Sequence, residues 1–349
     1  MQRLQRFAEE ASARFAAVPI GTAAGYRHRA RLAVRGRAAS PKLGLFQAGT
    51  HRIVDIPACL VHHPRINAVA DAVKAAVRES GFSPYADGPH RGLIRYVQVM
   101  LDAAAEHVQL VVVTNSDVPE DVSALWPLLQ DRLGASLQGL FWNGHPTRDN
   151  AVLGSHWQRI AGEPALGETI CGTRVFFPPD AFAQNNPAVY RQIVAQVGSW
   201  VPDGSDLVEF YAGVGAIGLS QSTRARSVVF NELGEGSLRG LSMGIEALPK
   251  AAASRTRIHS GRAGEHANLV AQATTVVVDP PRKGLDTELL DALCEAPPRL
   301  QTLIYLSCGP EAWMEEARRL QPVLPLREVI VHDLFPWTGH VEVLARFAR

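Results

Sequence analysis

LVEFYAGVGAIG, residues Leu207–Gly218, decides the fold of this chain. Its first half, Leu207–Tyr211, is an apolar run that predicts a short buried strand, and a helical pattern follows the glycines. The glycines Gly213, Gly215 and Gly218 satisfy the spacing GxGxxG. That spacing lets the backbone turn sharply and lets a ligand approach the N-terminus of the helix. The stretch predicts the first strand–loop–helix unit of a nucleotide-binding α/β fold.

Glu232 is the next informative residue after this loop. It ends the second predicted strand, where a carboxylate can accept hydrogen bonds from the hydroxyls of a ribose. An adenosine-bearing cofactor would explain the loop and the acid together. S-adenosylmethionine and a nicotinamide dinucleotide both contain this ribose, and a tight turn without a ligand is a third alternative.

Strand and helix patterns alternate regularly from about residue 180 onward, which predicts a doubly wound, mostly parallel sheet. The chain ends differently. Two strand-like runs, Glu328–His332 and His340–Phe347, are joined by a Phe-Pro-Trp-Thr-Gly turn and predict a closing antiparallel hairpin. We therefore expect an N-terminal α+β region over residues 1–175 and an α/β domain over residues 176–349.

Composition and charge narrow the class of protein. The chain has 46% hydrophobic and 20% charged residues, a normal globular mixture, and a formal net charge of +1. A nucleic-acid partner would therefore need a local basic surface. The first residues contain no apolar run long enough for a signal peptide or a membrane span. Their apolar positions predict an amphipathic helix instead: Leu4, Phe7, Ala8 and Phe15.

The cysteines give no sign of a disulfide framework or a zinc site, because no two of them form a CxxC pair. They are Cys59, Cys171, Cys294 and Cys308. The simplest location for such a chain is the reducing cytoplasm.

A one-sided row of arginines marks the segment Tyr26–Arg37. On strand periodicity one face holds five of them: Arg27, Arg29, Arg31, Arg35 and Arg37. The other face is mostly apolar, so the segment predicts a half-buried strand. Such a row can bind phosphates, which makes Arg27, Arg29 and Arg31 candidate RNA-binding residues, and a merely solvated strand face is the alternative.

Two further motifs follow predicted buried strands of the C-terminal half. VVVDPPRKG, Val276–Gly284, places Asp279 and Arg282 at the carboxyl edge of the sheet, where ligands bind in open α/β folds. LIYLSCGP, Leu303–Pro310, places Cys308 at the same edge, before a helix whose N-terminus can favour a thiolate. A turn-capping aspartate and a small buried apolar cysteine are the alternatives.

Glu342 interrupts the last apolar strand, within LFPWTGHVEV, Leu334–Val343. Strand alternation by itself predicts that this glutamate faces solvent.

Taken together, these motifs resemble the RNA uridine-5-methyltransferase family. FAQNNP at Phe182–Pro187, the glycine loop, DPPRKG, YLSCGP and LFPWTGHVE occur in the family's order and spacing. The first half is also similar, at Tyr26–Arg37 and from His51 to Cys59. The resemblance implies a Rossmann-like methyltransferase domain with an N-terminal RNA-binding region. It also implies methylation of carbon 5 of a uridine in ribosomal or transfer RNA.

The resemblance also implies roles for single residues. Cys308 matches the family's nucleophile and Glu342 its proton-abstracting base. The positions that match its S-adenosylmethionine contacts are Gln184, Tyr211, Glu232 and Asp279, beside the loop glycines Gly213 and Gly215. Several relatives hold an iron–sulfur cluster on four cysteines, of which this chain has only Cys59, so we expect no cluster and no other metal. We also expect no N-terminal RNA-binding barrel, and a monomer.

Departures from the family pattern leave a second hypothesis open. Where the family usually has cysteine, asparagine and Arg-Asp, this chain has Ala212, Gly309 and Glu315-Glu316, and Ala216 replaces a frequent polar residue. These changes would suit a degenerate paralogue that binds RNA without methylating it. A nicotinamide-dependent oxidoreductase is a third hypothesis, but it leaves DPPRKG and the Cys308–Glu342 pair unexplained.

Overall fold

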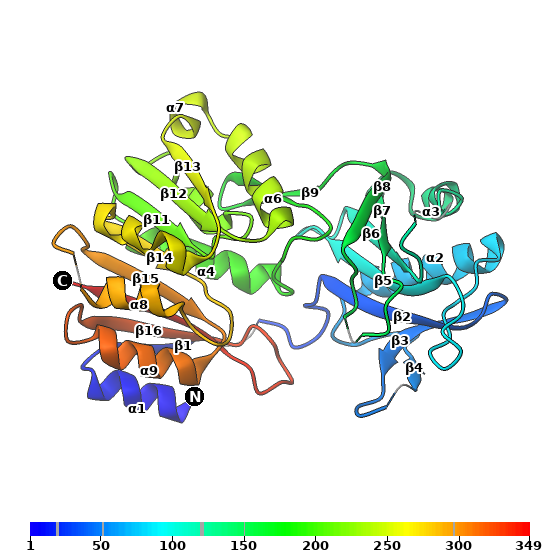
Figure 1. The fold of residues 1–349 in the computed structure, drawn as a ribbon. Helices are drawn as coiled ribbons and strands as arrows, with labels where there is room; N and C mark the ends of the chain where they lie inside the picture. The colour runs from blue at the N-terminus through cyan, green and yellow to red at the C-terminus, as the bar shows by residue number, and fades with distance from the viewer. Residues whose placement is uncertain (19–20, 51, 119–121, 150, 296) are drawn as a thin grey trace. The chain divides into compact units, whose positions relative to one another are not determined.

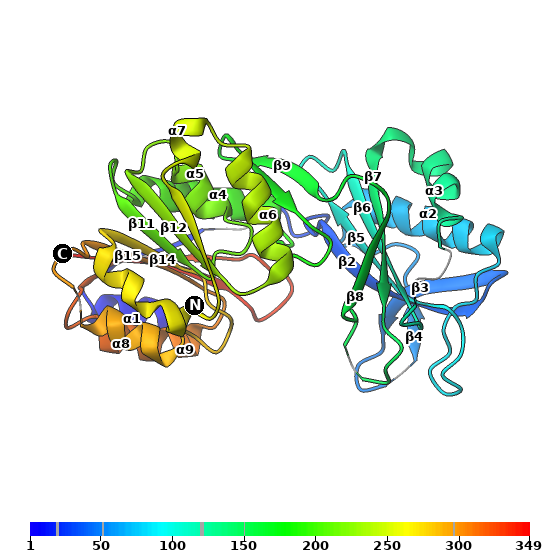
Figure 2. The same cartoon turned by 45° about the horizontal axis from the view of Figure 1, so that its top comes forward.

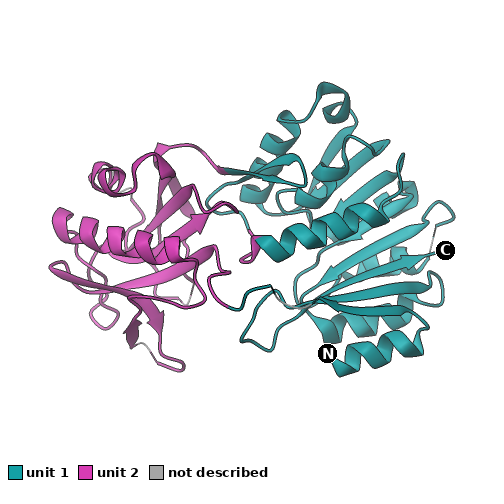
Figure 3. Cartoon of the chain, turned by 180° about the vertical axis from the view of Figure 1, so that it is seen from behind, with its two compact units in different colours: residues 1–23, 167–182, 188–349 teal, residues 24–166, 183–187 magenta. Residues whose placement is uncertain are grey.

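The computed structural model describes residues 1–18, 21–50, 52–118, 122–149, 151–295 and 297–349, so that His51 lies outside the described residues. The chain forms two compact units (Figure 3). Unit 1 comprises Met1–Ala23, Gly167–Phe182 and Ala188–Arg349, and unit 2 comprises Ala24–Leu166 and Ala183–Pro187. The first residues of the chain thus belong with its C-terminal half, whereas the sequence pattern groups them with the N-terminal region.

Unit 1 is built on an eight-stranded sheet, ordered β1-β16-β17-β15-β14-β11-β12-β13 (Figure 1). The strands are β1 (Arg14–Val18), β11 (Asp206–Phe210), β12 (Ser227–Glu232), β13 (Thr256–Ser260), β14 (Thr275–Val278), β15 (Thr302–Ser307), β16 (Leu326–His332) and β17 (Glu342–Ala348). β17 runs antiparallel to both of its neighbours, and the other pairings described are parallel. The predicted doubly wound sheet with a closing antiparallel hairpin is confirmed.

Helices cover this sheet, and a two-stranded sheet of β9 (Leu166–Ile170) and β10 (Thr173–Phe177) accompanies it. The helices are α1 (Gln2–Glu10), α4 (Pro187–Trp200), α5 (Ala216–Gln221), α6 (Glu235–Glu246), α7 (Lys250–Ala253), α8 (Thr287–Cys294) and α9 (Pro310–Leu320), with a 3₁₀ segment, η2 (Ala263–Gln272). Figure 2 shows α1, α8 and α9 grouped on one face, and one apolar core joins these helices to the strands beneath.

The N-terminal segment completes this core. Leu4 and Phe7 of α1 are buried, as the helical spacing predicts, and the Phe7 ring packs edge-on against Trp313 of α9 with centroids 5.3 Å apart. Phe15 lies outside the helix, on β1, because α1 ends at Glu10 and the chain then pairs with β16. Helix periodicity therefore applies only to the first ten residues.

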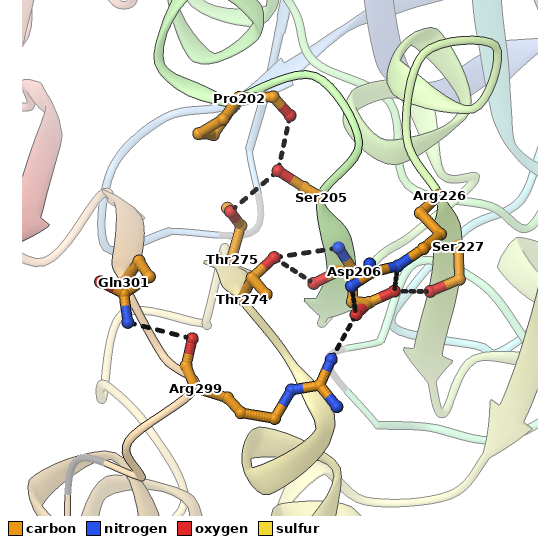
Figure 4. A network of polar contacts seen from close by, with 9 residues as sticks. All are labelled: Pro202, Ser205, Asp206, Arg226, Ser227, Thr274, Thr275, Arg299 and Gln301. Atoms are coloured by element: carbon orange, nitrogen blue, oxygen red, sulfur yellow. Dashed lines mark hydrogen bonds and ion pairs between the residues drawn. The ribbon is translucent and has the colours of Figure 1, made fainter.

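A polar network fastens the amino edge of the sheet, opposite the glycine loop (Figure 4). Its centre is Asp206, the first residue of β11, whose carboxylate accepts hydrogen bonds from Arg226 and from the Ser227 hydroxyl at 2.8 Å. The Thr274 hydroxyl accepts from the Asp206 N–H at 2.9 Å, and Arg299 pairs with the same carboxylate. These contacts join the starts of β11, β12 and β14, so the register of the sheet is fixed at the end away from the loops.

Unit 2 is a seven-stranded sheet with helices packed against its core. The strand order is β4-β3-β2-β5-β6-β7-β8. The elements are β2 (Arg29–Arg37), β3 (Ser40–Phe46), β4 (Ile53–Asp55), β5 (Ile94–Leu101), β6 (Val108–Thr114), β7 (Leu137–Gly144), β8 (His156–Gly162), α2 (Pro64–Ser80), α3 (Leu125–Leu133) and the 3₁₀ turn η1 (Gly134–Ser136). Ala30, Leu32 and Val34 of β2 lie in one core with apolar residues of α2 and α3, as strand alternation predicts. Among the described residues, no helix has the length and apolar character needed to cross a membrane.

Candidate active site

The glycine loop begins with a backbone turn that few residues adopt. Tyr211, directly after β11, has a φ of 56°, and Gly213 and Gly215 have φ values of 56° and 76°. A Cβ atom at Gly213 would meet no atom within 4 Å, so space lies in front of the loop, where a ligand can approach. Gly215 caps α5. The loop geometry fits an adenosine-type ligand.

Glu232 holds this loop from the neighbouring strand. One carboxylate oxygen accepts the Gly213 N–H at 2.7 Å, and the other accepts the Gly234 N–H at 2.6 Å. Each oxygen keeps a further lone pair. The residue predicted to receive ribose hydroxyls therefore also fixes the loop against which the ribose would lie.

Glu209 is a second acid beneath the loop, which the sequence analysis missed. It is 2% exposed and accepts the Gly218 N–H at 2.7 Å, at the first turn of α5. Burial raises its pKa to about 8, the Gly218 hydrogen bond opposes this shift, and the charges of Asp279 and Glu232 add to it. Its signal was an acid inside the apolar run Leu207–Tyr211.

Parallel pairing brings the remaining motifs to one edge. β14 lies between β11 and β15, so the residues that follow these three strands leave the sheet together. They are Tyr211, Asp279 and Cys308. β17 pairs antiparallel with β15, and its register opposes Ser307 to Val343. Cys308 and Glu342 are the next positions beyond this pair, and they therefore lie opposite each other at the ends of two neighbouring strands.

Glu342 is 2% exposed, so the expectation from strand alternation that it faces solvent is wrong. The reason is topological, because β17 lies between β15 and β16 and both faces of the sheet are covered. Burial and the charge of Asp279 raise the pKa of Glu342, while Arg282 lowers it. A raised pKa makes the Glu342 carboxylate a stronger base once it is ionised.

Cys308 is half-buried, and its thiol is not set up as a free thiolate. Burial raises its pKa, the charges of Glu342 and Asp279 raise it further, and Arg282 lowers it. Cys308, Glu342, Asp279 and Arg282 thus form one electrostatic cluster. Tyr190 of α4 joins it from the side, since the pKa of its phenol is raised mainly by burial and then by Asp279.

Two members of the cluster, Arg282 and Cys308, line a cavity of about 830 Å³, a size suited to small molecules or a nucleotide. Arg282, Cys308 and His340 line it, and so does the first turn of α1, with Arg3 among its residues. The contribution of α1 had no signal in the sequence.

The other predicted site residues belong to unit 2. Gln184 is partly exposed and lies in the segment Ala183–Pro187. Arg27 is partly exposed, and Arg31 is exposed with its Nε donating to Gln98 Oε1 at 2.8 Å. Arg29 is only 8% exposed and donates to the same oxygen at 3.2 Å. The arginine row is therefore not a uniform surface.

Arg35, in the same row, is buried and paired within unit 2. It is 6% exposed and donates two hydrogen bonds to Asp87, at 2.6 and 2.9 Å. Its guanidinium also lies about 5 Å from the ring centres of Phe46, Tyr85 and Tyr96. This residue holds unit 2 together and has no free face for a phosphate.

The sheet of unit 1, with its loop and edge acids, has the architecture of a Rossmann-like methyltransferase domain. The chain belongs to the tRNA (Uracil-5-)-methyltransferase family, whose family model matches residues 172–346. An uncharacterized RNA methyltransferase of Protochlamydia amoebophila is 34% identical, over 94% of this chain and 87% of its own length. One from Parasynechococcus marenigrum is 31% identical, over 93% and 70%.

A solved structure has the same fold. Pyrococcus abyssi tRNA (uracil-54, C5)-methyltransferase, in complex with S-adenosyl-L-homocysteine, superposes with a TM-score of 0.79 at 21% sequence identity. The match covers 99% of this chain and 81% of that one. The protein is therefore an enzyme, an S-adenosylmethionine-dependent RNA methyltransferase. The oxidoreductase hypothesis is wrong.

Proposed function

We propose that the protein methylates carbon 5 of a uridine in RNA, with Cys308 as covalent nucleophile and Glu342 as base. The observation that supports this most is the register of β15 and β17, which sets Cys308 opposite Glu342 at the edge where Asp279 and Arg282 also emerge. No metal is needed for this chemistry.

The reaction needs a nucleophile because carbon 5 of uracil is itself poorly nucleophilic. The Cys308 thiolate adds to carbon 6, and the electron pair of the 5,6 double bond moves toward carbon 5 as an enolate. When bound, S-adenosylmethionine supplies the electrophilic methyl group that carbon 5 takes up. Glu342 then removes the proton from carbon 5, the sulfur–carbon 6 bond breaks, and the double bond and the thiolate are restored.

The side chains around the pair have supporting roles. The Glu232 carboxylate and the space at Gly213 fit the adenosine end of the methyl donor. Asp279, whose charge acts on both Glu209 beneath the glycine loop and Cys308, fits a group at its reactive end. Arg282 lowers the pKa of the Cys308 thiol and of Glu342. A uridine must leave its base stack to enter the cavity, which favours single-stranded RNA or loops.

Two substitutions test the assigned roles because they stop the reaction at different steps. Cys308→Ala should abolish both methyl transfer and covalent attachment to RNA. Glu342→Gln should allow attack and methyl transfer but block elimination, which leaves a methylated protein–RNA adduct that survives denaturing electrophoresis. With a labelled methyl donor, label should accompany the shifted band only in the glutamate variant.

The substrate for this test is total ribosomal and transfer RNA from cells that lack the gene, and mass spectrometry of the product locates the modified uridine. Activity retained by Cys308→Ala would show that the nucleophile lies elsewhere. A wild-type protein that binds RNA but transfers no methyl group to either pool would instead favour the degenerate-paralogue hypothesis.

A further inference from the structure

Glu316 of α9 is a buried acid that the proposed mechanism does not use. It is 9% exposed, although it lies on a helix whose neighbouring Glu315 is exposed. One carboxylate oxygen accepts the backbone N–H of Leu285 at 2.9 Å, and the other accepts a hydrogen bond from the Tyr305 hydroxyl on β15. Both partners are buried, so the carboxylate replaces water for two groups that have no other acceptor in these contacts.

Leu285 directly follows the motif that holds Asp279 and Arg282. The chain reaches it through a turn in which the Gly284 N–H donates to the Pro281 carbonyl at 2.9 Å. Gly284 has a φ of 90°, and any side chain there would overlap Glu316 Oε1. The glutamate therefore lies directly against the backbone of this turn, which only glycine permits.

A second hydrogen bond fixes the next residue. The Asp286 N–H donates to the Tyr211 hydroxyl at 2.9 Å, and Tyr211 belongs to the glycine loop. The backbone N–H groups of Leu285 and Asp286, where this loop ends, are thus held by two side chains. Glu316 belongs to the helix after Cys308, and Tyr211 belongs to the glycine loop.

Gly309 closes the same loop from the other side. Its φ of −119° is accessible to any residue, so backbone conformation does not explain the glycine. A Cβ atom at this position would overlap the carbonyl oxygen of Arg282. The backbone of Arg282 therefore occupies the space that a side chain after Cys308 would fill.

We propose that Glu316 is a positioning residue that, together with Gly284 and Gly309, sets the loop Asp279–Leu285 against Cys308. The inference rests on the proposed roles of Cys308, Asp279 and Arg282. It gives a joint function to two departures from the family pattern. Glu316, which is longer than the usual aspartate, reaches the backbone of the turn, and Gly309, which lacks the side chain of the usual asparagine, leaves room for the Arg282 backbone.

Glu316→Ala leaves the Leu285 N–H and the Tyr305 hydroxyl without an acceptor, so the turn should shift and Arg282 with it. We expect kcat for methyl transfer to fall by about tenfold or more, because a displaced turn moves Arg282 relative to Cys308 and a small misplacement at the reacting groups can cost about a hundredfold in rate. The Kd for S-adenosylmethionine should change much less than kcat, since the loop glycines and Glu232 are untouched and Asp279, at the start of the loop, directly follows the paired strand β14. Glu316→Gln keeps one acceptor for Leu285 and should recover most of kcat.

Glu315→Ala is the matched control, one position away and exposed, and should behave as wild type. Gly309→Ala approaches the loop from the opposite side and should give the same loss in kcat with cofactor binding retained. If Glu316→Ala does not fold, the glutamine and Gly309 variants decide. The inference is overturned if Glu316→Ala matches Glu315→Ala, or if kcat falls only with the fraction of folded protein.

A failure of the proposed function can be distinguished from a failure of the positioning role of Glu316. Cys308→Ala assayed in parallel reports the nucleophile, whereas each Glu316 result is a ratio to wild type and does not depend on which group attacks. A fully active Cys308→Ala with a tenfold loss in Glu316→Ala would refute the nucleophile and keep the positioning role.

Discussion

Arg282 is the cation that acts on both reacting groups of the proposed mechanism. It lowers the pKa of the Cys308 thiol and of the Glu342 carboxyl, against burial and the charge of Asp279. Because attack needs the thiolate, kcat/KM should rise with pH until the thiol is ionised.

Arg282→Ala should move this rise to higher pH. Without the cation the pKa of Cys308 increases, and at neutral pH kcat/KM should drop about tenfold for each unit of that increase. The measurement is kcat/KM between about pH 6.5 and pH 10. Lys283→Ala is the control, an exposed neighbour with only a long contact of 3.7 Å to Asp286. Coincident profiles for Arg282→Ala and wild type would contradict the assigned role.

Single residues show how far sequence patterns extend. Cys308 and Asp279 could be placed from sequence because each directly follows an apolar run that had to be a buried strand. Glu342 is different, because it begins β17 and its burial depends on which strands flank β17, and that is a long-range property. Glu209 had a local signal, an acid inside an apolar run, whereas Glu316 is buried by contacts with Leu285 and Tyr305 that no local pattern shows.

At the scale of elements, β2 separates into two kinds of arginine. Arg31 and Arg37 are exposed, whereas Arg35 is enclosed by Asp87 and three aromatic rings. Strand alternation placed all of them on one face but could not tell which would be covered by Asp87 and Tyr85, from the segment between α2 and β5.

Arg35→Ala should destabilise unit 2, while Arg31→Ala with Arg37→Ala should affect RNA affinity. Removal of the buried cation should cost about 2 kcal/mol in the free energy of unfolding, since the Arg95 carbonyl and the partly exposed Asp87 lose their hydrogen-bond donor. The exposed pair should flatten the salt dependence of RNA binding by about one unit of slope per arginine or somewhat less. Urea denaturation and binding titrations at several salt concentrations separate the effects. An unchanged slope in the double variant would leave the exposed arginines as a solvated face.

Helix α1 makes a different contribution, because its first turn lines the cavity beside Cys308. Phe7 packs against Trp313 and lies under the Arg318 guanidinium, which anchors the helix on α9. Arg3 forms an exposed ion pair of 3.4 Å with Glu311, so it can exchange that partner for a phosphate.

Arg3→Ala should therefore raise KM for RNA several-fold and reduce the salt slope by about one unit, with the Kd for S-adenosylmethionine unchanged. Arg14→Ala is the control, since Arg14 is exposed at the start of β1 and does not line the cavity. Steady-state kinetics at varied salt make the comparison. An equal effect of both substitutions would mean that only total charge matters.

For the whole molecule, the alternation of strands and helices was sufficient to predict the α/β sheet and its antiparallel hairpin. What alternation could not supply was the membership of α1 and β1 in unit 1. Their partner strand β16 lies more than 300 residues away, as the Arg14–Glu328 register shows, and no local pattern encodes such a pairing.

Buried titratable groups should also give the molecule an unusual pH dependence of stability. Burial raises the pKa of Glu209 to about 8 from its ordinary 4.5, and it also raises the pKa of Asp279 and Glu342. At pH values between the ordinary pKa of such an acid and its raised pKa in the folded protein, the folded state binds more protons than the unfolded state. The free energy of unfolding therefore falls as pH rises through this range. His62 and His332 act oppositely, because burial lowers their pKa to about 4 from 6.5 and their contribution rises with pH only up to 6.5.

The two effects oppose each other below pH 6.5, and only the acids remain above it. The free energy of unfolding should therefore decline from about pH 6.5 to pH 8, by up to about 1.4 kcal/mol per pH unit for each such acid. Glu209→Gln should flatten this decline, because its amide still accepts the Gly218 N–H but does not titrate. The free energy of unfolding is measured by urea denaturation at about pH 6.5, 7.2 and 8. Glu246→Gln, on the exposed face of α6, is the control. If Glu209→Gln and Glu246→Gln both declined as steeply as wild type, Glu209 would have to be ionised in the folded protein throughout this range.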